Sequence, residues 1–255
     1  KYSYMKNKVF DFSIDFSRGI HFIIGENGIG KSTFIRCLCG LNKGFGKGFY
    51  YENNFIKKPE KLISLVMQDV NYQLFTESVL EEISLVSDDE KLKEDVLVQL
   101  LLWDKRQQHP QSLSGGEKQL VAITAVACMK QKVYIFDEPS ASLDIDAIKR
   151  LKSAIKTLKE LGKIIIIVEH RLYYLKDILD KLYTIEDAKL IELESIDEES
   201  IKIHNLRTLN EISKPELIES CKDFSYRKVS VNNNSTSDLG EEEKILSCRN
   251  YKYSY

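Results

Sequence analysis

The chain has 255 residues, of which 43% are hydrophobic and 30% are charged, and its formal net charge is −2. This is the composition of a soluble globular protein with one sizeable core, or a core plus a small subdomain. The near-neutral charge disfavours a nucleic-acid partner, and no apolar stretch is long enough to span a bilayer. Five cysteines without a framework spacing favour reduced, partly buried thiols, and we expect a cytosolic protein.

Loosely alternating residues over 5–18 predict an antiparallel pair of strands. An apolar run over 20–24 predicts a buried strand, and 34–39 predicts the first turns of a helix. Between them lies Gly25-Glu-Asn-Gly-Ile-Gly-Lys31-Ser32-Thr33, which fits the phosphate-binding pattern G-x-x-x-x-G-K-[ST] without a mismatch. Its glycines let backbone N–H groups point inward, and the helix N-terminus adds the positive end of its dipole. A chance glycine-rich turn is the poorer interpretation, and we predict a nucleotide site.

Strands and helices alternate through the following residues. Apolar runs predict buried strands over 62–66, 133–136 and 164–168. Helical spacing predicts two short helices within 78–103, separated by an acidic, lysine-rich break over 87–95, and longer helices over 114–127 and 145–161. The pattern predicts an α/β fold: a P-loop NTPase three-layer sandwich with a mainly parallel sheet, an antiparallel β subdomain and a small inserted helical subdomain.

Two carboxylates follow the predicted strand over 133–136. Asp137 ends that strand, where it can hold Mg²⁺ directly or through water. Glu138 beside it could activate a water for attack on a γ-phosphate. The alternative interpretation is an acidic strand end that makes an ordinary helix cap.

A second anion site is predicted at Ser114-Gly-Gly-Glu117, where two glycines and a hydroxyl stand at a helix start. Two such helix starts far apart in the chain make sense if they sandwich one nucleotide between two copies of the domain. On its own, Ser-Gly-Gly would be a weak signal and usually a plain loop.

Several motifs in register now resemble one family. Leu113-Ser-Gly-Gly-Glu-Lys-Gln119 resembles the signature motif of ATP-binding cassette (ABC) ATPases. Gln68 resembles the family's Q-loop glutamine, Ser140-Ala-Ser-Leu-Asp144 its D-loop and His170 its switch histidine. The order and spacing hold across residues 1–190. Thr-Ser-Gly is commoner than Ser-Ala-Ser in the D-loop, a departure that we expect to be harmless.

The resemblance implies ATP and Mg²⁺ as cofactors and a role for each matching residue. Glu138, His170 and Gln68 would serve catalysis, and Ser32, Gln68 and Asp137 would serve the metal. The residues expected at the nucleotide are Tyr4, Asn27, Gly28, Gly30, Lys31, Ser32, Thr33, Ser114, Gly115, Gly116 and Asp144. Tyr4 would stack on adenine, although it could equally be an ordinary strand aromatic. The residues expected to be structural or on the surface are His21, His109 and His204.

A finer resemblance follows Gln68. Gln73-Leu-Phe75 resembles the ATPases of energy-coupling factor (ECF) importers of vitamins and transition-metal ions, and Glu169-His-Arg-Leu-Tyr-Tyr-Leu175 resembles their tandem-cassette members. It implies an ATP-hydrolysing subunit at the cytoplasmic face of the cell membrane. Its partners would be a second cassette (itself or a sister), a transmembrane energy-coupling subunit and a separate substrate-binding membrane subunit. Leu74 and Phe75 would form an apolar docking edge or belong to the subdomain core.

The predicted organisation is a cassette over 1–195, with its helical subdomain at about 70–130, and a tail and disordered linker over 196–244. Residues 245–255 resemble the first strand of another cassette, and the chain begins and ends on Lys-Tyr-Ser-Tyr. We interpret the chain as an excerpt of a tandem protein, or as one cut from a circularised or repeated sequence.

Two other functions stay open. One is a soluble, non-transport ABC ATPase associated with translation or DNA repair, which the short insert and near-neutral charge disfavour. The other is a regulatory nucleotide-binding module without turnover, which the presence of Gln68, Glu138 and His170 disfavours.

Overall fold

The computed structural model describes residues 9–25, 28–41, 49–171, 174–186, 189–193 and 246–254, with the backbone alone for 9–12 and 246–254. The strands are β1 (Val9–Phe16), β2 (Gly19–Ile24), β3 (Phe49–Tyr51), β4 (Asn54–Phe55), β5 (Ile63–Val66), β6 (Val133–Asp137), β7 (Ile164–Val168), β8 (Lys181–Glu186), β9 (Lys189–Leu193) and β10 (Leu246–Ser254). The α-helices are α1 (Lys31–Leu38), α2 (Val79–Ser84), α3 (Glu90–Gln99), α4 (Gly115–Cys128) and α5 (Ile145–Glu160). None of these helices has the length and apolar character that crossing a membrane requires.

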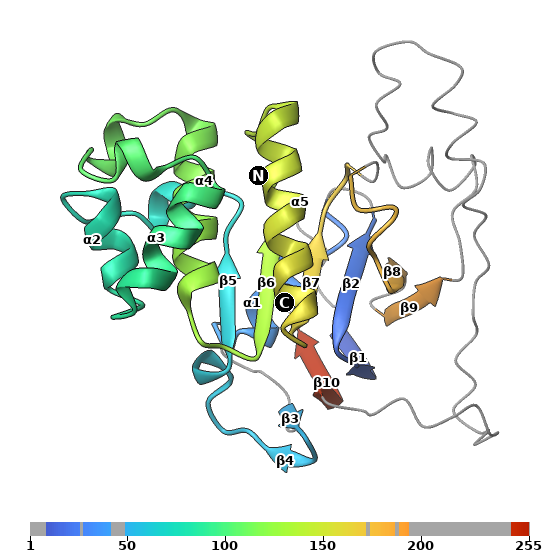
Figure 1. Cartoon of the computed structure of the whole chain (residues 1–255). Helices are drawn as coiled ribbons and strands as arrows, with labels where there is room; N and C mark the ends of the chain where they lie inside the picture. Colours follow the sequence, from blue (N-terminus) through green and yellow to red (C-terminus); the bar gives the residue numbers. More distant parts are fainter. Residues whose placement is uncertain are drawn as a thin grey trace, which may run out of the picture.

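A six-stranded sheet forms the centre of the molecule, in the order β5-β6-β7-β2-β8-β9 (Figure 1). Neighbouring strands from β5 through β8 in this order run parallel, and β9 alone is antiparallel to its neighbour β8. The predicted mainly parallel sheet is confirmed. Strands β6 and β7 are buried throughout, because both faces of the sheet are covered, and this is why their sequences are apolar runs without alternation.

The two faces of the sheet carry separate hydrophobic clusters. In β7, Ile165 and Ile167 pack with the helices α4 and α5, whereas Ile164 and Ile166 pack with α1. The sheet therefore lies between two layers, and the three-layer α/β sandwich is confirmed. Helix α5 presents one apolar side to the sheet, and each of its fully buried Ile and Leu side chains contributes about 1.5–3 kcal/mol of transfer free energy.

A second, antiparallel sheet has the order β1-β10-β3-β4. Strand β1 pairs with β10 from Val9 opposite Ser254 to Phe16 opposite Leu246. The antiparallel pair of strands predicted over 5–18 is wrong for the described residues, since 9–16 form a single strand. Its partner comes from a distant part of the sequence, and local alternation carries no information about which strands pair. Residues 1–8 lie outside the described part of the chain.

Helices α2 and α3 lie to one side of the sheet, beyond β5 (Figure 1). The break predicted over 87–95 is shorter than expected, because α3 already begins at Glu90. Asp89 caps that helix by accepting a hydrogen bond of 3.1 Å from the backbone N–H of Leu92. Lys93 is buried, and its ammonium donates to Ser84 Oγ and Glu90 Oε1. Charged residues predicted to lie in the break therefore form the first turns of a helix.

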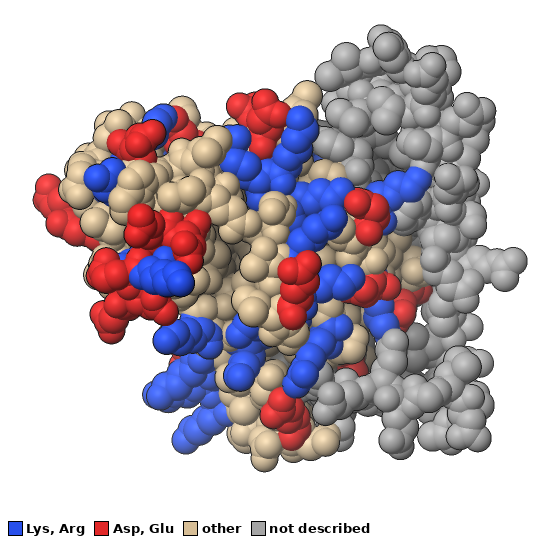
Figure 2. Space-filling view, in the orientation of Figure 1, with Lys and Arg blue, Asp and Glu red and all other residues tan. Residues whose placement is uncertain are grey.

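The described surface carries side chains of both charges. On the face drawn in Figure 2, basic and acidic side chains of the described residues are interspersed, with acidic ones gathered over the region of α2 and α3.

Burial raises the pKa of the Cys39 thiol to about 12 and that of Cys128 to about 11, so both stay protonated at neutral pH. These cysteines are packing residues, as the sequence predicted.

Candidate nucleotide site

The phosphate loop leads from β2 into α1. Gly28 and Gly30 have φ of 81° and 112°, in the left-handed region that favours glycine, and Gly30 is the N-cap residue of α1. Lys31 is buried, and its ammonium donates a hydrogen bond of 2.6 Å to the backbone oxygen of Gly25, across the loop. This bond places a cation and the α1 N-terminus at one edge of the sheet, where phosphates can bind.

Asp137 ends β6 and fits the role of a metal ligand. Its carboxyl group is buried, and Oδ1 makes no hydrogen bond within the described part of the chain. Burial raises the pKa of this carboxyl, a hydrogen bond from the Ser32 side chain lowers it, and the charge of Glu138 raises it further. A buried oxygen without a partner, beside a hydroxyl, is a donor set that suits Mg²⁺.

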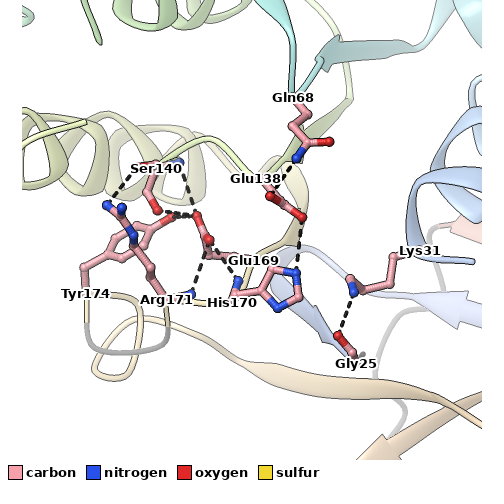
Figure 3. A network of polar contacts seen from close by, with 9 residues as sticks. All are labelled: Gly25, Lys31, Gln68, Glu138, Ser140, Glu169, His170, Arg171 and Tyr174. Atoms are coloured by element: carbon pink, nitrogen blue, oxygen red, sulfur yellow. Dashed lines mark hydrogen bonds and ion pairs between the residues drawn. The ribbon is translucent and has the colours of Figure 1, made fainter. Parts of the chain in front are cut away.

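Glu138 stands between two polar side chains from other elements (Figure 3). The amide of Gln68 donates a hydrogen bond of 2.9 Å to Glu138 Oε2, and His170 Nε2 lies 3.2 Å from Oε1. The backbone of Glu138 has φ of 49°, and its N–H donates to the Val168 oxygen at 2.8 Å. A non-glycine residue in this conformation is unfavourable by itself, and such residues cluster at functional sites.

His170 is buried after the end of β7. Within the described part of the chain, neither ring nitrogen makes a hydrogen bond, and Nε2 approaches Glu138 at an ion-pair distance only. A buried imidazole whose nitrogens lack hydrogen bonds is suited to receive a ligand group.

The second predicted anion site begins helix α4. Ser114 is its N-cap residue and forms a capping box with Glu117, whose Oε2 accepts from both the backbone N–H and the hydroxyl of Ser114 at 2.8 Å. The ammonium of Lys105 pairs with the other oxygen of Glu117. Gly116 lies against the loop before α5, where a Cβ would come 2.8 Å from the Ser142 oxygen.

Asp144, the last residue of that loop, is the N-cap of α5. Its carboxylate accepts a hydrogen bond of 2.7 Å from the backbone N–H of Ala147. The contact that the structure gives this side chain is therefore a helix cap.

The structure brings one subset of the predicted residues together. Gln68, Glu138 and His170 are in contact, and Ser32 contacts Asp137. The contacts described above for Ser114 and Gly116 are with Glu117 and Ser142. Predicted residues outside the described part of the chain are Tyr4, Asn27 and His204. Of the histidines expected to be structural or on the surface, His21 is buried and His109 is exposed.

The segment just after β5 adds two observations near the site, the first of which the sequence did not predict. Gln73 accepts a hydrogen bond from Met67 N and donates one to the Leu65 oxygen, both at 2.8 Å, so it fixes the backbone just before Gln68. For Leu74 and Phe75, predicted as a docking edge or as subdomain core, the two environments differ, because Leu74 is buried in the core and Phe75 is 75% exposed.

A family model and several known proteins are similar to this chain. The family model described as "ABC transporter" matches residues 9–141. A putative ABC transporter ATP-binding protein of Treponema denticola is 34% identical over 174 residues, which are 67% of this chain and 36% of that protein. The arginine transport ATP-binding protein ArtM of Bacillus subtilis is 32% identical over 185 residues, which are 67% of this chain and 77% of that protein. The chain thus spans little more than a third of the Treponema relative's length.

A solved structure of a protein from an ABC transporter complex is also similar to this chain. The structure of cbiO1 from Clostridium perfringens, described as part of the ABC transporter complex cbiONQ, matches with a TM-score of 0.60 and 28% identity. The match covers 70% of this chain and 78% of that one.

Proposed function

Since this chain belongs to the ABC transporter family of ATPases, we propose that it hydrolyses ATP to ADP and phosphate and that a membrane partner couples this reaction to transport. The observation that carries the proposal is the contact of Glu138 with both Gln68 and His170, on the segment that also holds Asp137. A carboxylate fixed by two polar side chains is suited to take a proton from an attacking water.

The roles of the individual residues follow from where they lie. Lys31 and the backbone N–H groups of the phosphate loop would bind the phosphates, with Asn27, Gly28, Gly30 and Thr33 completing the loop. Ser32 and Asp137, with Gln68, would hold Mg²⁺, which when bound neutralises charge on the β- and γ-phosphates. His170 would contact the γ-phosphate, and Tyr4 would stack on adenine.

We propose that the working unit is a pair of cassettes, with either a second copy or a sister chain. Ser114, Gly115 and Gly116 offer a hydroxyl and a helix N-terminus, and the contacts that hold this segment are with Glu117 and Ser142. These groups, with Asp144, would close over the nucleotide of the opposing chain. ATP would then stabilise the closed pair, and hydrolysis would reopen it.

The membrane partner would dock on the helical side of the cassette. Phe75, in the predicted ECF-like motif, is 75% exposed, and Tyr72, just before the motif, is 81% exposed. The resemblance of Gln73-Leu-Phe75 supports an importer of the ECF type for a vitamin or a transition-metal ion, and similarity to cbiO1, described as part of an ABC transporter complex, supports a membrane partner. The chain would sit at the cytoplasmic face of the membrane, with an energy-coupling and a substrate-binding subunit as partners.

Recovery of the tagged chain from gently solubilised host membranes tests this assignment. We expect mass spectrometry to identify a polytopic membrane protein with the wild-type chain and far less of it with Phe75→Asp. Phe55→Asp is the control, because Phe55 is also an exposed aromatic (59%) but lies in β4. Recovery of ribosomes or DNA-repair factors instead would contradict the importer and favour the soluble alternative.

A further inference from the structure

Glu169 is a buried carboxylate between β7 and His170 (Figure 3), and it is 2% exposed. Its Oε2 accepts hydrogen bonds from the backbone N–H of Ser140 (3.2 Å), the Ser140 hydroxyl (2.5 Å) and the Tyr174 hydroxyl (3.2 Å). Its Oε1 accepts from the backbone N–H groups of His170 (2.8 Å) and Arg171 (3.2 Å). One buried side chain therefore ties the segment of His170 to the loop between β6 and α5.

Arg171 holds the same loop from its carbonyl side. Its guanidinium donates to the backbone oxygens of Ser140 (2.9 Å), Leu143 (3.3 Å) and Ala141 (3.5 Å). Glu169 accepts a hydrogen bond from a backbone N–H of the loop, and Arg171 donates hydrogen bonds to backbone carbonyls of the loop. Backbone donors and acceptors of the loop are therefore both held by this segment. Charge-assisted hydrogen bonds of this kind are stronger than those between neutral groups.

The loop of residues 140–143 also contacts α4, the helix that begins at the signature residues. A Cβ on Gly116 would lie 2.8 Å from the Ser142 oxygen, which shows how closely the α4 backbone approaches the loop. At the other end of the network, His170 Nε2 is 3.2 Å from Glu138 Oε1. A continuous series of contacts therefore runs from Gly116 through the loop and Glu169 to His170 and Glu138.

We infer that Glu169 is a positioning residue that makes the 140–143 loop and His170 move as one body. A nucleotide bound by the signature residues of this chain would then set the position of His170 in the chain's own site. The inference rests on the proposed pairing, in which the signature residues face the opposing chain's nucleotide. A carboxylate suits this position because hydrogen-bond donors surround it, and an amide would turn its NH₂ group toward some of them.

The test is Glu169→Gln, with ATP hydrolysis and ATP binding measured on the same protein. We expect kcat to fall between about 10- and 100-fold, because a misplaced His170 no longer meets the γ-phosphate. The Kd for a fluorescent ATP analogue should stay within about twofold, since the phosphate loop is untouched. Because the proposed pair binds two nucleotides, we expect the wild-type rate to rise sigmoidally with ATP concentration and that of Glu169→Gln to rise hyperbolically. Glu160→Gln, on the exposed side of α5, is the control.

A second variant tests the route through the loop. Ser140→Ala removes the hydroxyl that donates to Glu169 and should lower kcat in the same direction. The double variant should be no slower than Glu169→Gln alone, because both changes act on one contact. Additive losses, or wild-type kcat in Glu169→Gln, would overturn the inference. If Glu169→Gln does not fold, Ser140→Ala and Arg171→Lys decide, and wild-type kcat in both overturns it.

Hydrogen–deuterium exchange gives a readout that needs no hydrolysis. In Glu169→Gln, amides of residues 138–144 and 168–171 should exchange faster together, and unchanged exchange in 138–144 would overturn the inference. If the wild-type chain releases no phosphate, the proposed function fails, but the exchange experiment still decides whether Glu169 joins the two segments.

Discussion

The ammonium group of Lys105 pairs with Glu117 Oε1, while Oε2 of the same carboxylate accepts two hydrogen bonds from Ser114. Lys105 therefore balances a negative charge that stands beside a proposed phosphate site. The two side chains are 36% and 29% exposed, so water screens the pair, and we expect it to contribute little to folding. Its importance would lie in the binding of an anion.

We expect Lys105→Met to raise the ATP concentration for half-maximal activity about tenfold, because the uncompensated carboxylate of Glu117 repels the γ-phosphate of the opposing chain. Glu117→Gln in the same chain should restore it, since the amide keeps the shape of the carboxylate without its charge. Steady-state phosphate release against ATP concentration measures both. Lys118→Met is the control, because that ammonium donates to the amide oxygens of Asn71 and Gln111. A double variant as impaired as Lys105→Met would contradict the charge argument.

Glu138→Gln should reduce phosphate release at least about 100-fold while ATP binding persists, because an amide cannot accept the proton of the attacking water. With ATP and Mg²⁺, the variant should run as a closed pair in size-exclusion chromatography, and wild type should not accumulate in that form. Retention of ordinary turnover would remove Glu138 from the role of base.

Asp137→Asn should raise the stability of the ligand-free protein and reduce the stability that the protein gains from its ligands. The folded-state pKa of Asp137 lies above its ordinary value of 3.8, so the ligand-free protein loses stability as pH rises between these two pKa values, and the loss persists at neutral pH. The asparagine variant should therefore have a higher Tm than wild type at pH 7 without ligand. It should gain far less Tm from ATP and Mg²⁺, because it offers the metal no charge.

Thermal unfolding measures both effects. The difference in ligand-free Tm should shrink as pH falls toward the folded-state pKa, where the wild-type carboxyl is protonated too. An asparagine variant that is less stable than wild type without ligand would contradict the assignment of Asp137 as a buried charge awaiting a cation.

Gly116→Ala and Gly115→Ala should differ in stability although the two glycines are adjacent. A Cβ at 116 would meet the Ser142 oxygen at 2.8 Å, whereas a Cβ at 115 would be 3.8 Å from Ser142 Cβ, an ordinary contact. We expect Gly116→Ala to lower the free energy of unfolding by about 1–3 kcal/mol and Gly115→Ala to leave it nearly unchanged. Denaturant unfolding without nucleotide measures both variants. Equal losses in the free energy of unfolding would show that the loop of residues 140–143 moves to accommodate the added methyl group.

The sequence predicted the parts of the fold that depend on local pattern. The apolar runs over 133–136 and 164–168 became β6 and β7, and helical spacing over 145–161 matched α5. The family resemblance assigned catalytic roles to Gln68 and His170, and the place of Glu138 after a predicted strand suggested its role. The structure brings the three together because each follows a strand of the parallel sheet, and such strands end at one edge of the sheet.

Other features depend on contacts that pattern does not encode. Glu169 was noticed only as part of a resemblance, because nothing in its neighbours shows that Ser140, far away in the chain, would donate to it. Leu74 and Phe75 are adjacent apolar residues, and the fold alone decides that one is buried and the other exposed. The Lys105–Glu117 pair joins two segments through long, flexible side chains, which sequence spacing does not register.

The pairing of β1 with β10 has a consequence for how the protein is made. Strand β1 is among the first described residues to leave the ribosome, and β10, which lies between β1 and β3, is the last. Until β10 emerges, the facing edges of β1 and β3 lack their partner, and exposed strand edges invite pairing with other chains. The parallel sheet needs no such delay, because its strands all precede residue 194. A nascent chain would therefore complete its nucleotide-binding core first and its antiparallel sheet last, so early release or slow synthesis would favour aggregation through that second sheet.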